Sequence, residues 1–125
     1  MSSSYRDLKV WQRSIDLAEN IYRLTSVFPA SEMYGLTSQM RRAAVSIASN
    51  IAEGWGRRSR KDYSRYLEIA GGSNDEPRTQ LVISERLGCG NARLLVDAHT
   101  LADEIERMLG GLHKSLQTPR KRSSV

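Results

Sequence analysis

The sequence has 125 residues, of which 26% are charged, and its 19 Lys and Arg residues outnumber 14 Asp and Glu to give a net charge of +5. This length suffices for one small domain with its own core and is too short for two. The excess of positive charge is compatible with an anionic partner, although many small basic proteins bind nothing with such a charge. The single cysteine, Cys89, excludes a disulfide within the chain and fits a reducing compartment.

The N-terminal residues contain no continuous apolar run of the kind found in secretory signals, and Asp7 comes early in them. Apolar runs elsewhere are only a few residues long, too short to span a bilayer. We therefore expect a cytoplasmic protein without a membrane segment.

The first predicted helix begins near Asp7, a candidate N-cap or first-turn acid, and ends before Pro29, which pushes the residue before it out of helical geometry. Two neighbouring apolar seams run along it, the first formed by Leu8, Trp11, Ile15, Ala18 and Tyr22, and the second by Leu17, Ile21, Leu24 and Phe28. A face this wide indicates a helix with more than one neighbour.

The second predicted helix begins near Leu36 or Thr37 and ends at Gly54 and Gly56. Its main apolar face is formed by Leu36, Met40, Ala43, Ile47 and Ile51. Many of its other residues are small, which allows helix backbones to approach closely, and we expect it to be the most buried helix.

The third predicted helix begins after Ser59, a good N-cap, with Asp62 placed as in a capping box. The segment from Gly71 to Pro77 interrupts its pattern. Each glycine weakens a helix by roughly 1 kcal/mol relative to alanine, and an interior proline costs about 3 kcal/mol. We therefore predict that this helix is kinked or broken around Gly71–Pro77 and that its pattern resumes until Gly88.

The fourth predicted helix is capped by Asn91 and ends before Pro119. Its apolar ladder consists of Leu94, Ala98, Leu101, Ile105, Met108, Leu112 and Leu116. Short connections favour antiparallel neighbours. The sequence thus predicts an all-α protein, an up-down-up-down antiparallel four-helix bundle over residues 1–118, followed by a disordered basic tail at residues 119–125.

No arrangement of residues in the sequence is typical of a catalytic, metal or cofactor site. His99 and His113 are about 21 Å apart along one helix and cannot share a metal ion within the chain, and neither follows a glutamate at the spacing of a bundle di-metal site. Cys89 has no base that the sequence places beside it. We expect a protein that is not an enzyme and needs no cofactor.

The strongest functional signal is a basic cluster between residues 41 and 65, opposed only by Glu53 and Asp62. It consists of Arg41, Arg42, Arg57, Arg58, Arg60, Lys61 and Arg65. Arginine suits bidentate contacts to phosphate, so the cluster predicts binding to the backbone of RNA or DNA without base reading. A solvated surface, or ion pairs to another subunit, would explain the same residues. An enzyme site assembled between subunits from Glu53, Asn50 and an arginine is a remoter alternative.

Three segments together resemble a known bacterial family: DLKVWQ, YGLTSQMRRAAVSI and SNIAEG, within a similarity that extends from Tyr5 to about Leu116. It is called the four-helix bundle protein family, or the 23S ribosomal RNA intervening-sequence protein family. The resemblance implies an up-down bundle that assembles as a homopentameric ring. A related branch, the accessory variability protein of diversity-generating retroelements, binds nucleic acid and a reverse transcriptase. The sequence departs from the family at Asn74 and Pro77, where leucines are usual.

A ring would also bury the apolar seams of the first helix together with Trp11 and Trp55, which we expect to be exposed in a single copy. The main prediction is therefore a non-enzymatic oligomer, a pentamer by resemblance, that binds nucleic acid. The alternative is a structural or adaptor ring that recruits a protein partner such as a reverse transcriptase.

Overall fold

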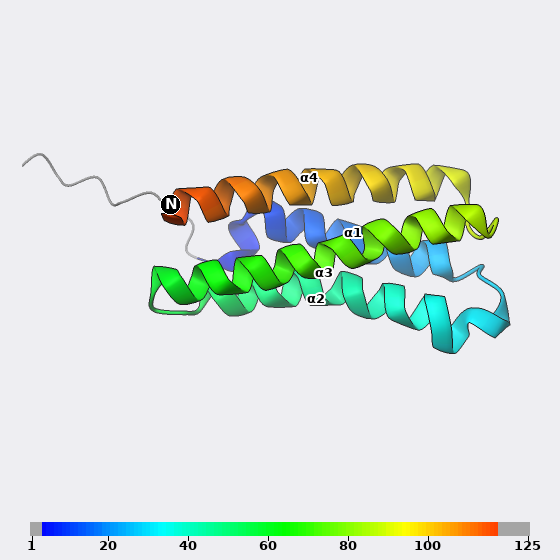
Figure 1. The fold of residues 1–125 in the computed structure, drawn as a ribbon, viewed down its shortest axis with the longest axis horizontal. Helices are drawn as coiled ribbons and strands as arrows, with labels where there is room; N and C mark the ends of the chain where they lie inside the picture. The colour runs from blue at the N-terminus through cyan, green and yellow to red at the C-terminus, as the bar shows by residue number, and fades with distance from the viewer. Residues whose placement is uncertain (1–3, 118–125) are drawn as a thin grey trace, which may run out of the picture.

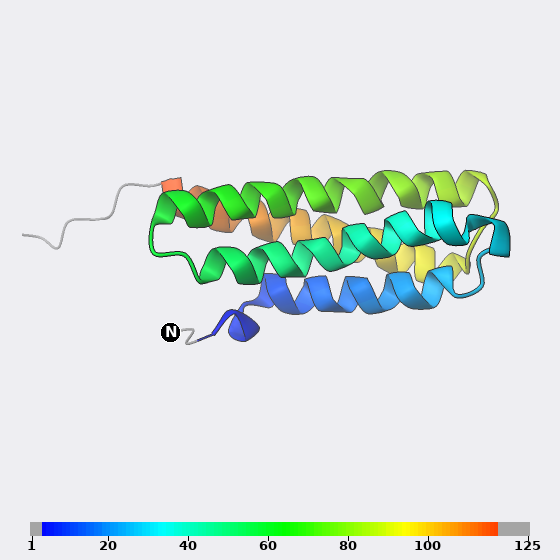
Figure 2. The ribbon, with the colours of Figure 1, turned by 90° about the horizontal axis from the view of Figure 1, so that it is seen from below.

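The computed structural model describes residues 4–117 and shows four helices packed in an antiparallel bundle (Figures 1 and 2). They are α1 (Lys9–Thr25), α2 (Ser38–Trp55), α3 (Arg60–Arg86) and α4 (Ala92–Gln117). Each helix packs against the next one in the chain, and α1 also packs against α4, so the four helices form a square. The predicted all-α four-helix bundle is confirmed. The predicted tail, residues 119–125, lies outside the described residues.

The core lies along the axis of the bundle and follows the predicted seams only in part. The second seam of α1 is buried, whereas no residue of its first seam is fully buried and Tyr22 is 46% exposed. Val10, Leu17, Ile21 and Leu24 come from α1; Met40, Ala44, Ile47 and Ile51 from α2; Leu67, Ala70 and Leu81 from α3; and Leu95, Ala98, Ala102, Ile105 and Leu109 from α4. Burial of these side chains is the main stabilising term, at about 1.5–3 kcal/mol for each large aliphatic residue. None of the described helices is both long enough and apolar enough to cross a membrane.

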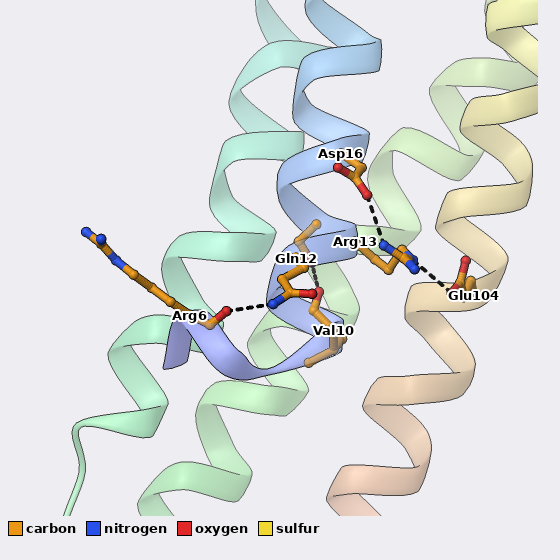
Figure 3. Close-up of polar contacts among 7 residues, drawn as sticks. Arg6, Val10, Gln12, Arg13, Asp16 and Glu104 are labelled. Atoms are coloured by element: carbon orange, nitrogen blue, oxygen red, sulfur yellow. Dashed lines mark hydrogen bonds and ion pairs between the residues drawn. The ribbon is translucent and has the colours of Figure 1, made fainter. Parts of the chain in front are cut away.

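Helix α1 begins later than predicted, because residues Tyr5–Asp7 form a separate 3₁₀ turn (η1). Asp7 lies in that turn, so the prediction that it caps α1 is wrong; Leu8 occupies the cap without a side-chain hydrogen bond. Gln12 Nε2 donates to the carbonyl oxygen of Arg6 at 2.9 Å and holds the turn against the helix (Figure 3). The 3₁₀ turn is therefore attached to the first turns of α1.

Figure 3 also shows how α1 is joined to α4 through Arg13. Its guanidinium lies 3.2 Å from Asp16 on its own helix and 3.1 Å from Glu104 on α4. The hydrogen bond to Glu104 raises the pKa of Arg13 above its already high value, so the group stays charged. This pair fixes the two helices side by side at the polar margin of the core.

The connection between α1 and α2 is more ordered than the predicted linker. It contains a 3₁₀ turn, η2 (Ala30–Glu32), and a further turn, η3 (Met33–Thr37), which is kinked at the non-helical Gly35 and leads into α2. The Glu32 carboxylate accepts a hydrogen bond from the backbone N–H of Leu36. This local arrangement presents Tyr34 outward, with 95% of its surface exposed.

The third helix corrects the sequence-based prediction. Helix α3 is continuous through Gly71, Gly72 and Pro77, so the predicted break is wrong, and the structure shows no kink there. Two polar side chains of this segment bind it to its neighbours: Asn74 Nδ2 donates to the carbonyl oxygen of Ala102 on α4 at 2.9 Å, and the hydroxyls of Ser73 and Ser46 lie 2.9 Å apart. Pro77 is itself buried in the core. Packing on both sides thus outweighs the helix-breaking propensity.

Helix α3 ends in a Schellman motif, in which Gly88 N–H donates to Glu85 and Cys89 N–H to Ser84. Gly88 has a φ of 70°, which favours glycine. Asn91 then caps α4, as predicted, by accepting a hydrogen bond from Leu94 N–H at 3.0 Å. The predicted N-cap of α3 is also confirmed, since Ser59 accepts from Asp62 N–H at 3.0 Å.

Candidate nucleic-acid interface

The structure divides the predicted basic cluster into two groups. Arg41 and Arg42 lie near the start of α2, whereas the other five follow the end of that helix: Arg57, Arg58, Arg60, Lys61 and Arg65. From Arg41 to Trp55, the last residue of α2, the helix rises about 21 Å. The seven residues therefore do not form one patch within a chain. We call the group of five the cation end of the bundle.

The cation end forms where α2 stops and α3 starts (left in Figures 1 and 2). Gly54 is buried there between the two helices, and a Cβ atom on it would lie 2.7 Å from Cβ of Tyr66. Glycine is therefore required for the close approach of α2 and α3. The connection and the start of α3 then place four cations within the five residues 57–61.

Arg60 and Lys61 occupy the first turn of α3, where Asp62 is the acidic residue. The helix macrodipole is positive at this end, so cations there reduce helix stability while an incoming anion is attracted. Both side chains are exposed. The arrangement favours anion binding at some cost in stability.

Arg57 and Arg65 are oriented by Tyr66. The Arg57 guanidinium lies 4.7 Å from the centroid of the Tyr66 ring and that of Arg65 lies 5.1 Å from it. Arg57 also donates to the Tyr66 hydroxyl at 2.6 Å and to Glu53 at 2.9 Å. These contacts pre-order two of the five cations.

The remaining three cations differ in their partners. Arg60 donates to the carbonyl oxygen of Ser115 at 2.9 Å and so joins the start of α3 to the end of α4. Arg58 and Lys61 are exposed and make no hydrogen bond or ion pair with any residue in the described range 4–117. Their charges have no structural task among those residues and are available to a ligand.

Arg41, at the other end of α2, has a structural role. Its Nε donates to the buried Thr25 hydroxyl at 2.9 Å, and its guanidinium lies 4.7 Å from the ring centroid of Tyr22. It therefore joins α2 to α1. Arg42 is exposed, and within residues 4–117 it has no hydrogen-bond or ion-pair partner.

The other candidate residues are engaged locally. His99 contacts Glu85, and His113 lies 3.0 Å from Glu68, so each histidine faces an acid across the α3–α4 contact. Asn50 donates to the carbonyl oxygen of Ser46 on its own helix. Among residues 4–117, no three His, Cys, Asp or Glu side chains are grouped so that they could hold a metal ion.

Comparison with known proteins identifies the family. The model of the 23S rRNA-intervening sequence protein matches residues 6–111, which is most of the chain. The chain belongs to this family. A search of curated proteins gives no match.

A crystal structure at 1.70 Å resolution supports the family fold. It is that of a protein of unknown function from the S23 ribosomal protein family of Bacteroides thetaiotaomicron VPI-5482. The two chains share 24% sequence identity and superpose with a TM-score of 0.76 over 84% of this chain and 95% of that one. At this identity the likeness shows the fold alone.

Two features of the surface escaped the sequence analysis. The prediction that Trp11 and Trp55 are exposed is wrong: both are half-buried, Trp11 beside Tyr5 and Trp55 beside Tyr63, in edge-to-face contacts. The exposed apolar side chains lie elsewhere and include Tyr34, Val27, Leu87 and Val96. These exposed apolar residues lie between the apolar seams of the helices or beyond their ends. The helical periodicity of the sequence therefore does not predict their exposure.

Proposed function

We propose that this protein is a non-enzymatic oligomer that binds the backbone of RNA or DNA through its cation end. The observation on which the proposal depends is the state of Arg58 and Lys61, which are exposed and have no partner among residues 4–117. Arg57 and Arg65 flank them in orientations set by Tyr66. Phosphate contacts of this kind fix position without reading sequence.

The electrostatics of the cation end support an anionic ligand. Charges placed against the macrodipole of α3 reduce stability in the free protein, and a phosphate group at the start of the helix would offset that penalty by meeting the exposed cationic side chains. Arginine presents a planar fork that matches phosphate, which favours it over lysine at such a surface.

The proposed oligomeric state and cellular location are taken from the family resemblance. A homopentameric ring would repeat the cation end and multiply weak phosphate contacts. A cytoplasmic location belongs to the same proposal, whereas recruitment of a protein partner such as a reverse transcriptase belongs to the alternative.

A filter-binding titration with RNA and with DNA at two salt concentrations tests the proposal. The informative variant is Arg58→Ala/Lys61→Ala, which removes two exposed charges without breaking a described contact. Its matched control is Arg23→Ala/Arg93→Ala, which removes two exposed charges elsewhere that form only surface ion pairs.

We expect the wild type to bind with an affinity that falls steeply with salt. The first variant should bind more weakly, with a salt slope shallower by about 1 or more, whereas the control should bind like the wild type. Absence of binding at low salt would contradict the proposal and favour the adaptor ring.

A further inference from the structure

A polar crevice lies between the first half of α2 and the second half of α3, and its volume is about 320 Å³. We call it the glutamine crevice and define it by its polar lining residues, which are Gln39, Arg42, Ser46, Ser73, Glu76 and Gln80. Small-molecule sites in proteins begin at about this volume. The crevice is therefore suited to one small polar ligand.

Gln80 is the buried polar side chain of the crevice, with 9% of its surface exposed. Its Oε1 is buried and has no hydrogen-bond partner among residues 4–117, and no residue of that range accepts a hydrogen bond from its Nε2. Buried amides are nearly always hydrogen-bonded, because leaving them unpaired destabilises the fold. An unpaired amide in the wall of a crevice is suited to a ligand that donates and accepts hydrogen bonds there.

Pro77 leaves a second group without its usual partner at the crevice. Proline has no backbone N–H, so the carbonyl oxygen of Ser73, one turn earlier in α3, lacks its helical donor. Ser73 lines the crevice, and its hydroxyl lies 2.9 Å from that of Ser46 on the α2 wall. The α3 wall thus offers a backbone acceptor as well as the Gln80 amide.

The two charged residues of the crevice have opposite signs and lie on different helices. Arg42 belongs to α2 and Glu76 to α3, and both are exposed. Neither forms a hydrogen bond or an ion pair with any residue in the range 4–117, which includes the other member of the pair. A direct ion pair between two exposed side chains would add little stability, so a ligand that separates them loses little.

We propose that the glutamine crevice binds a small zwitterion with one carboxylate and one ammonium group, of which a free α-amino acid is the simplest class. Arg42 binds the carboxylate, because its planar fork matches the two oxygens. Glu76 and the carbonyl oxygen of Ser73 bind the ammonium group. Gln80 forms hydrogen bonds with the polar part of the ligand that enters the crevice.

The balance of charge selects this class of ligand. A small anion would be attracted by Arg42 and repelled by Glu76, and a small cation would meet the reverse arrangement. An uncharged sugar could bond to Gln80 but would leave both charged residues without a partner. A zwitterion is the class that satisfies both charges and the amide together.

This inference goes beyond the proposed function and does not depend on it. Arg42 lies near the start of α2, whereas the cation end follows the end of that helix. The ligand would join α2 to α3 at a site of its own. Binding of the ligand and binding of RNA can therefore be measured separately.

Thermal denaturation of the full chain, with single L-amino acids added in millimolar excess, tests the proposal. We expect at least one of them to raise the melting temperature, increasingly so with its concentration. Calorimetric titration then compares that amino acid with its two half-molecules, the amine without the carboxylate and the acid without the ammonium group. Each half-molecule should bind about tenfold more weakly or worse, because it loses a charged hydrogen bond. No stabilisation by any amino acid, or equal binding of a half-molecule, would overturn the proposal.

Two variants test the residues of the crevice. Gln80→Met replaces the buried amide by an apolar chain of the same length, and Arg42→Gln/Glu76→Gln removes both charges. The matched control is Arg23→Gln/Glu19→Gln, which removes the same two charges from a surface ion pair on α1.

We expect both crevice variants to bind the amino acid about tenfold more weakly or worse, and the control to bind it like the wild type. Without ligand, Gln80→Met should be at least as stable as the wild type, because it no longer buries an unpaired amide. Unchanged binding in either crevice variant, or an equal loss in the control, would refute the site. RNA filter binding should be unaffected by Gln80→Met, so failure of this proposal is distinguishable from failure of the cation end.

Discussion

The two ends of α2 carry arginines that look alike in sequence and differ in structure. At the start of the helix, Arg41 is held by a buried hydroxyl and an aromatic ring. Beyond the end of the helix, Arg58 and Lys61 point into solvent and have no partner among the described residues. A run of cations in a sequence therefore indicates a binding surface only after the cations that join one helix to another have been identified and excluded.

The helix ends also differ in how they are packed. At the cation end, α2 and α3 approach so closely that Gly54 has no room for a side chain. At the other end, the turn η3 is kinked at Gly35 and leaves Tyr34 exposed. The first end is therefore suited to a fixed array of charges, and the second to contact with another surface.

The largest expected effect comes from Gly54→Ala, which breaks the close approach at the cation end. The added Cβ would lie 2.7 Å from Tyr66 Cβ and 3.0 Å from Tyr63 Cδ1, and overpacking of this kind costs about 1–3 kcal/mol. The control is Gly56→Ala, whose nearest contact, Glu53 O at 3.7 Å, is ordinary. Urea denaturation should show a loss of stability for Gly54→Ala alone; equal stability of the two variants would contradict the account.

A smaller loss of stability is expected from Arg41→Ala. This variant tests whether Arg41 stabilises the fold, in contrast to the cations that have no described partner. Loss of the hydrogen bond to Thr25 and of the contact with Tyr22 should lower the free energy of unfolding by about 1–2 kcal/mol. Arg42→Ala, its neighbour without a described partner, should change it by less than about 0.5 kcal/mol. Thermal and urea denaturation at low protein concentration measure both, and a larger loss for Arg42→Ala would reverse the assignment.

The smallest effect concerns Tyr63, at the cation end, whose hydroxyl is buried without a partner among residues 4–117. Burial raises the pKa of Tyr63 above its usual value of 10. The folded protein therefore keeps this phenol neutral while the unfolded chain ionises it, so the contribution of Tyr63 to stability is complete below about pH 10 and is lost as the pH rises above that value.

Tyr63→Phe should remove this part of the pH dependence, so the variant loses less stability than the wild type between pH 9 and pH 11 in urea titrations. Tyr34→Phe, at a side chain that is 95% exposed, is the matched control and should follow the wild type. Parallel pH curves for Tyr63→Phe and the wild type would exclude the expected role of burial.

The sequence predicts the helices and their caps at Ser59 and Asn91 because these features depend on local spacing and local hydrogen bonds. It fails at Pro77, where the hydrogen bonds of Ser73 and Asn74 to other helices outweigh local propensity. The basic cluster can be read from sequence, but the partners of its members cannot, because Arg41 binds Thr25 and Tyr22, which lie on another helix. The exposure of Tyr34 depends on the kinked turn η3, for which the sequence gives no periodic signal.

Hydrogen–deuterium exchange with and without a single-stranded RNA tests most directly which end of the bundle binds nucleic acid. The account predicts that RNA slows exchange of the backbone amides in residues 56–61, at the cation end, and leaves residues 30–37 unchanged. Slower exchange confined to residues 30–37, or none at residues 56–61 under conditions where RNA binds, would contradict it.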